Sequence, residues 1–118
     1  MTDGVLRVAF AHHSWATIRL IDACRDLSDE ELRFEVVGTL GPIIDTVRHI
    51  VNGDAGYLEI LTADVATGAV ADDMSLDSFK RAAEHNQARW DAFLSQPVDP
   101  DAIVREIDPE DGYQRWAR

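Results

Sequence analysis

The chain has 118 residues, of which 46% are hydrophobic and 28% charged, and this is the size and composition of one globular domain. Its formal net charge of -11, without a locally basic face, argues against nucleic-acid binding. Cys24 is the single cysteine, which excludes an internal disulfide framework and a cysteine-rich zinc ribbon. No apolar run reaches the roughly 18 residues of a membrane span, and the N-terminus does not resemble a signal peptide. We therefore expect one cytoplasmic domain over residues 1–118, without membrane or nucleic-acid partners.

The first expected helix runs from about Val5 to Arg25, because apolar residues recur along it at helical spacing. His12 falls in the same row, where a lone histidine is more often a core residue than a metal ligand. A short helical turn is expected directly afterwards, since Ser28 and Glu31 have the spacing of a capping box. The predicted core row of the first helix is Val5, Ala9, Ala16, Leu20, Ala23 and Leu27.

Two further long helices are bounded by capping residues. Thr39 or Gly41 can cap a helix that holds Pro42 in its first turn and extends to about Leu61. Residues 62–73 have the composition of a loop, and Ser75 caps the third long helix, which ends near Pro97. The predicted core positions are Ile43, Val47, Ile50, Val51, Leu58 and Leu61 in the earlier helix and Leu76, Phe79, Ala83, Trp90 and Phe93 in the later one.

Asn86 falls within the apolar row of the third long helix. We therefore predict a buried amide, which must be hydrogen-bonded. A partner on another helix is expected, with His12 as the candidate.

The C-terminal segment is predicted to form strands rather than a helix. Residues 103–107 are predicted to be extended, residues 108–112 to turn, and residues 113–116 to return as a second strand. No helix follows this hairpin, although three amphipathic helices usually need a fourth to close a bundle.

His49 is the most informative of the four histidines. It lies off the apolar stripe, in a row with Pro42, Thr46, Gly53 and Gly56, whose members are otherwise small or polar. Glycines in mid-helix cost stability, about 1 kcal/mol each relative to alanine, so they suggest that something approaches this face closely. One interpretation is a pocket floor with a single imidazole pointing into it. The other is an exposed histidine beside two glycines that let another helix pack.

The remaining candidate ligands carry weaker signals. His12 and His13 are consecutive and project about 100° apart, so they cannot both chelate one ion from a regular helix. His85 stands between Arg81 and Arg89 at spacings of four, which is typical of a solvated face. Asp45 precedes His49 by one turn and could orient its imidazole or be a surface acid. Cys24 is expected to be a buried small hydrophobe.

Three segments together resemble the DinB/YfiT-like family of metalloenzymes. They run from Phe10 to Ala16, from Gly38 to Val51, and through the hairpin ending in Asp111-Gly112-Tyr113. The resemblance implies an all-α fold, an up-and-down four-helix bundle of which this chain holds three helices and the hairpin. It also implies a divalent metal held by three histidines, one at the position of His49 and two from an HxxxH pair on the fourth helix. Only His49 therefore receives a metal role, and His12 receives none.

The pair of histidines expected on the fourth helix is missing from this sequence. We favour a C-terminally incomplete domain over a member that cannot bind metal by itself, because the residues up to Arg118 carry no helix stop signal. The resemblance implies a metal-dependent enzyme, a small-thiol transferase or isomerase or a hydrolase. Because imidazole suits these ions, zinc or nickel is the expected cofactor in the complete protein. A non-catalytic dimerisation module and a small-molecule-binding module, with its pocket over Gly53 and Gly56, are the alternatives. We also expect a homodimer, because an uncovered apolar face drives association.

Overall fold

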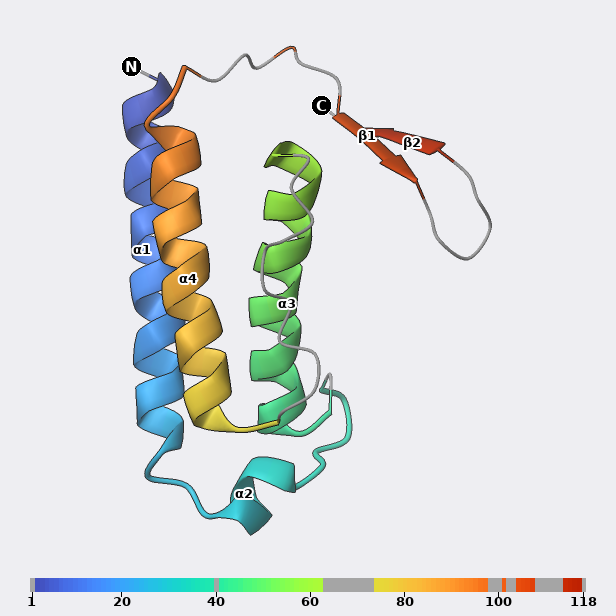
Figure 1. The fold of residues 1–118 in the computed structure, drawn as a ribbon. Helices are drawn as coiled ribbons and strands as arrows, with labels where there is room; N and C mark the ends of the chain where they lie inside the picture. Colours follow the sequence, from blue (N-terminus) through green and yellow to red (C-terminus); the bar gives the residue numbers. More distant parts are fainter. Residues whose placement is uncertain are drawn as a thin grey trace.

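The computed structural model describes residues 2–39, 41–62, 74–97, 101, 104–107 and 114–117. They include four helices and two paired strands: α1 (Thr2–Cys24), α2 (Asp29–Arg33), α3 (Ile43–Thr62), α4 (Leu76–Leu94), β1 (Val104–Ile107) and β2 (Gln114–Ala117) (Figure 1). The predicted helices are confirmed to within three residues at each end. None of these helices combines the length and apolar character needed to cross a membrane.

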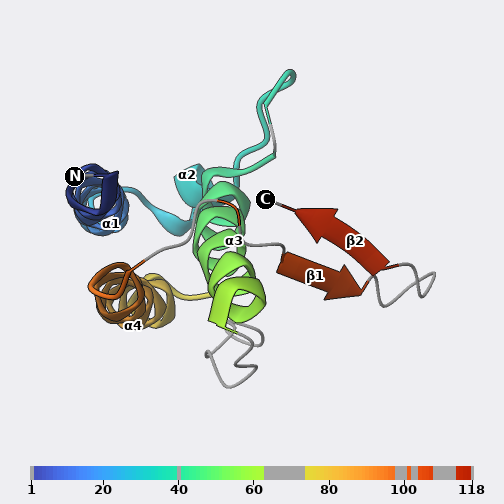
Figure 2. The same cartoon turned by 90° about the horizontal axis from the view of Figure 1, so that it is seen from above.

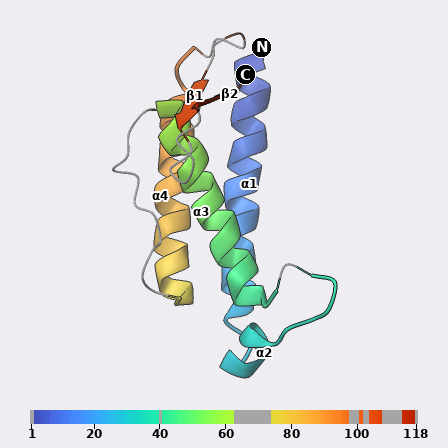
Figure 3. The same cartoon turned by 90° about the vertical axis from the view of Figure 1, so that its right-hand side faces the viewer.

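Helix α4 lies against both α1 and α3, whereas α1 and α3 contact each other much less (Figures 1 and 2). Helix α1 runs opposite to the other two, but α3 and α4 run in the same direction (Figures 1 and 3). The all-helical class is confirmed, while the strict up-and-down alternation expected for a bundle does not hold between α3 and α4. The predicted hairpin is antiparallel, and β1 lies beside α3. The predicted turn at 108–112 falls outside the described residues.

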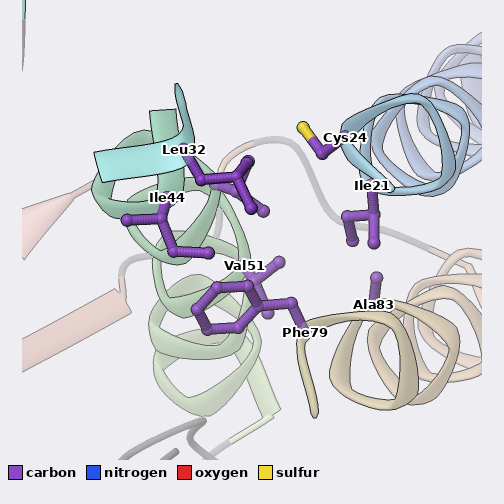
Figure 4. Close-up of a cluster of buried hydrophobic side chains, with 8 residues drawn as sticks. Ile21, Cys24, Leu32, Ile44, Val51, Phe79 and Ala83 are labelled. Carbon is purple, nitrogen blue, oxygen red and sulfur yellow. The ribbon is translucent and has the colours of Figure 1, made fainter. Parts of the chain in front are cut away.

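Two clusters of buried side chains hold the helices together. Phe79 of α4 is fully buried in the larger cluster, together with Ile44, Val47 and Val51 of α3 and Ile21 of α1 (Figure 4). Leu58, Trp90 and Leu94 form the smaller cluster near the other end of α3 and α4. The short helix α2 begins with the predicted capping box at Ser28 and adds Leu32 to the core.

The buried face of α1 differs from the predicted one. Ser14, Thr17, Ile21 and Cys24 are buried, whereas Val5 is 69% exposed and Leu20 is 40% exposed. Ala9, Ala16 and Ala23 are exposed too. The helix carries apolar residues on more than one face, so periodicity alone does not select the face that meets α4. In α3, Ile43 and Leu61 were also predicted as core, and both are more than one-third exposed.

Asn86 is buried as predicted, at 2% exposure. Its Nδ2 donates a hydrogen bond to the backbone carbonyl of Val51, at 3.1 Å, and so links α4 to the middle of α3. The prediction that His12 is the partner of Asn86 is wrong, because the His12 side chain is exposed on α1. Its ring lies beside Trp15, with the centroids 5.5 Å apart.

Replacing Phe79 with alanine tests which cluster carries the stability. Because the ring is fully buried against three helices, we expect Phe79→Ala to lower the free energy of unfolding by about 3–5 kcal/mol. Urea unfolding followed by circular dichroism measures the change. The matched control is Phe34→Ala, because that ring is 66% exposed and its loss should cost less than about 0.5 kcal/mol. Equal losses in the two variants would contradict the assigned core.

An exposed ion-pair network joins the second half of α1 to the start of α4. Lys80 Nζ donates to Asp22 Oδ1 at 3.0 Å, and Arg25 bridges Asp22 to Asp77. The hydrogen bond from Lys80 is the largest cause holding the pKa of Asp22 below its ordinary value, and Arg25 adds to it. Since the pKa is depressed, the charged carboxylate stabilises the fold above its unfolded pKa, and this contribution is lost as pH falls through the folded pKa.

We therefore expect Lys80→Met to raise the pKa of Asp22 toward its ordinary value, whereas Lys80→Arg should leave it depressed. Titration of the Asp22 side-chain carboxyl carbon by NMR measures both. The methionine variant should also lose less stability between neutral and acidic pH than the parent. An Asp22 pKa that is the same in the methionine variant and the parent would show that Lys80 does not pair with it in solution.

Candidate functional site

His49, the predicted metal ligand, is exposed on α3. It lies about 200° around the helix from both Val47 and Val51, so it stands on the side opposite the buried core. Its imidazole makes no hydrogen bond or ion pair to another residue of the described ranges. Asp45 is partly buried one turn earlier and does not hydrogen-bond to it, so the orienting contact considered from the sequence is absent in this part of the chain.

The glycines beside His49 face open space. A Cβ added to Gly53 or to Gly56 would meet no atom within 4 Å outside the local helix backbone. Within the described chain, no second helix packs on this row, which removes the close-packing explanation for the two glycines there. What remains is an accessible imidazole on a helix face of small residues.

A complete metal centre is not assembled by the residues that the structure describes. Among them, no three His, Cys, Asp or Glu side chains come together as a set that could hold an ion. His12 and His85 are exposed on α1 and α4, respectively. Cys24 is buried as predicted, at 3% exposure, and burial raises the pKa of its thiol. Since thiolate is the form that binds metal, this environment disfavours a ligand role for Cys24.

A carboxylate–imidazole pair that the sequence analysis missed joins α1 to α3. His13 Nε2 lies 2.9 Å from Asp54 Oδ1 and 2.8 Å from Oδ2. The Asp54 side chain is 14% exposed and that of His13 is 40% exposed, so the pair is partly withdrawn from water. The predicted register placed His12 inward, but the register of α1 turns His13 toward α3 instead. The two partners are 41 residues apart in sequence, so no local spacing links them.

An apolar cavity of about 420 Å³ lies next to this pair and is bounded by three helices. The surface of this cavity is almost wholly apolar, and aromatic rings make up much of it. Phe10 and Trp90 stack with their centroids 4.2 Å apart, and Phe10 meets the His13 ring edge to face. The residues lining this cavity are Leu6, Phe10, His13, Asp54, Tyr57, Leu61, Trp90, Phe93 and Leu94.

A second apolar cavity, of about 600 Å³, lies where α1 and α3 approach α2. Leu20 and Ala23 of α1 face Ile43 and Val47 of α3 across it, and Cys24 forms part of its wall. Neither cavity is lined by Gly53 or Gly56, so neither corresponds to the pocket expected over these glycines.

Comparison with known proteins identifies the family. The sequence model of the DinB family matches residues 1–114, which is nearly the whole chain. The chain therefore belongs to the DinB family, as its resemblance in three segments indicated. No curated protein and no solved structure matches the chain significantly.

Proposed function

We propose that this DinB-family protein is a metal-dependent enzyme in which His49 supplies one ligand to a divalent ion, zinc or nickel. Family membership and the accessibility of His49 support this proposal. Imidazole suits both of these metals. Small thiols are the substrate class that the resemblance implies, with transfer, isomerisation or hydrolysis as the reaction.

The surroundings of His49 fit a ligand role, although they provide one ligand only. The imidazole has no competing partner among the described residues, and the open face over Gly53 and Gly56 leaves room for an ion. A normal zinc site uses three or four protein ligands, so the others would come from side chains outside the described ranges. A bound ion with an open position supplies Lewis acidity, which lowers the pKa of a coordinated thiol or water.

The metal proposal is tested by elemental analysis of the natural full-length protein after incubation with Zn²⁺ or Ni²⁺ and desalting. We expect the parent to retain the ion and His49→Ala to lose it, because removing one of three ligands weakens binding steeply. His85→Ala is the matched control, since that histidine is exposed on α4 and should leave the metal content unchanged. Equal metal in the parent and in His49→Ala would remove His49 from the site. A metal-free parent would remove the enzyme proposal.

We further propose that the protein forms a homodimer, through the apolar faces that α1 and α3 leave uncovered. The row predicted as core on α1 is exposed, and on α3 Tyr57 is 65% and Leu61 is 38% exposed. Exposed apolar surface on neighbouring helices is typical of an interface. Trp90 near the end of α4 is buried within the chain, so the proposed interface involves α1 and α3.

Sedimentation velocity at micromolar concentration tests the dimer. We expect the parent to sediment as a dimer and Leu20→Glu as a monomer, because a carboxylate placed in an apolar contact is desolvated. Val37→Glu is the control, because that side chain is fully exposed outside the helices and its charge should not disturb the assembly. A folded parent that remains monomeric at this concentration would contradict the proposal.

A further inference from the structure

A groove of about 320 Å³ lies between α1 and α4, which are side by side and antiparallel (Figures 1 and 2). Ala11 of α1 and Ala88 of α4 line it, and their small side chains leave the space between the helices open. The groove differs from the two apolar cavities because polar and charged side chains of both helices line it. These are Arg7, Ser14, Glu84, Gln87 and Asp91.

Ser14 supplies a hydroxyl without a partner to this groove. The residue is only 4% exposed, and its side chain makes no hydrogen bond within the described residues. Its Oγ is not sealed in the interior, as Asn86 Oδ1 and Trp90 Nε1 are, and it is this groove that Ser14 lines. Buried polar groups are normally hydrogen-bonded, so the partner of this hydroxyl has to come from the groove.

The charges along the groove differ between its two ends. At one end, Arg7 Nε donates to Asp91 Oδ1 at 3.1 Å, so these two charges compensate each other. Glu84 lies two turns before Asp91, about 10 Å along α4, and has no ion-pair partner in the described part of the chain. Since α1 runs opposite to α4, Ser14, two turns after Arg7, lies at the same end as Glu84. This end therefore presents a carboxylate and a hydroxyl oxygen that are both free to accept hydrogen bonds.

This arrangement favours a cation with an apolar part. One guanidinium and two carboxylates line the groove, so it carries an excess of negative charge, and the net charge of -11 on the whole chain attracts cations further. Phe10, Trp90 and Leu94 also line the groove and provide apolar surface for a hydrocarbon group. The volume lies at the lower end of the range of small-molecule sites, which suits a short ligand.

We propose that this groove binds a small organic ammonium ion with a short alkyl tail. The ammonium group donates hydrogen bonds to the Glu84 carboxylate and to Ser14 Oγ, and the tail lies against Phe10 and Trp90. The site is separate from the proposed metal site and dimer interface, because it lies between α1 and α4 and is lined neither by His49 nor by the exposed apolar residues of α3.

Proton–nitrogen NMR titration with n-butylammonium, and with 1-butanol as an uncharged probe of similar length, tests the proposal at neutral pH and low salt. We expect n-butylammonium to bind about fivefold more tightly, the ratio that one exposed ion pair supplies. The backbone amides near Ser14 and Glu84 should shift most. Added salt should reduce the preference, because it screens an exposed charge. Equal affinities for the two probes, no binding of either, or shifts spread over the acidic surface would overturn the proposal.

Four variants separate a binding groove from a gap that holds only water. Glu84→Gln should remove the preference for the ammonium ion, whereas Glu59→Gln, a matched change of an exposed acid on α3, should keep it. Ser14→Ala should weaken binding of the ammonium ion about threefold, and Ala88→Leu should abolish binding of both probes by filling the groove. Circular dichroism checks the fold of each variant. If Ser14→Ala unfolds, the exposed Glu84→Gln still decides, because an unchanged preference in that variant would contradict the site.

Discussion

Helix α4 packs on two neighbours at once, and this double contact determines what the other helices can do. Phe79 and Ala83 fill the space between α1 and α3 near one end, and Trp90 and Leu94 bury Leu58 near the other. Asn86 lies between these clusters and donates to the carbonyl of Val51. A buried amide is satisfied only with a partner in place, so this hydrogen bond favours one register of α4 on α3. The parallel direction of the two helices agrees with the order of contacts along both.

Helix α4 covers one face of α1 and one face of α3, so each of these helices retains a second apolar face that α4 does not cover. On α1 this face includes Val5 and Leu20, and on α3 it includes Ile43, Tyr57 and Leu61. The His13–Asp54 pair links the two helices through polar side chains, and both apolar cavities lie along the same junction. The His13–Asp54 pair and the two cavities therefore follow from how α4 packs, because they lie at the junction of α1 and α3 that this packing leaves open.

Much of the fold could be predicted from the sequence, because the caps and the hydrophobic period are local signals. The capping box at Ser28, the cap at Ser75 and the burial of Asn86 followed from spacing alone. The buried face of α1 could not be predicted in the same way. That helix has apolar residues on two faces, and the choice between them depends on where α4 packs, which is a long-range property. The predicted core row is exposed except at its last member, Leu27, which packs partly buried against the larger cluster.

The same error explains how the candidate site was missed. Choosing the wrong face of α1 placed His12 inward and left His13 without a role, although His13 is the histidine that meets a carboxylate. The row of small residues around His49 left two interpretations open, a pocket floor or a face on which another helix packs. The structure gives an exposed imidazole beside open glycines, and the identity of a metal and of its other ligands depends on the family resemblance.

Helix α3 presents two kinds of chemistry on separate faces, and this limits how they can cooperate. His49 and Asp54 are separated by about 140° around the helix axis, so an ion held by His49 would lie on a different side of α3 from the His13–Asp54 pair. A substitution at His49 should therefore leave the contact between His13 and Asp54 in place, and a substitution at His13 should leave the exposed face around His49 unchanged.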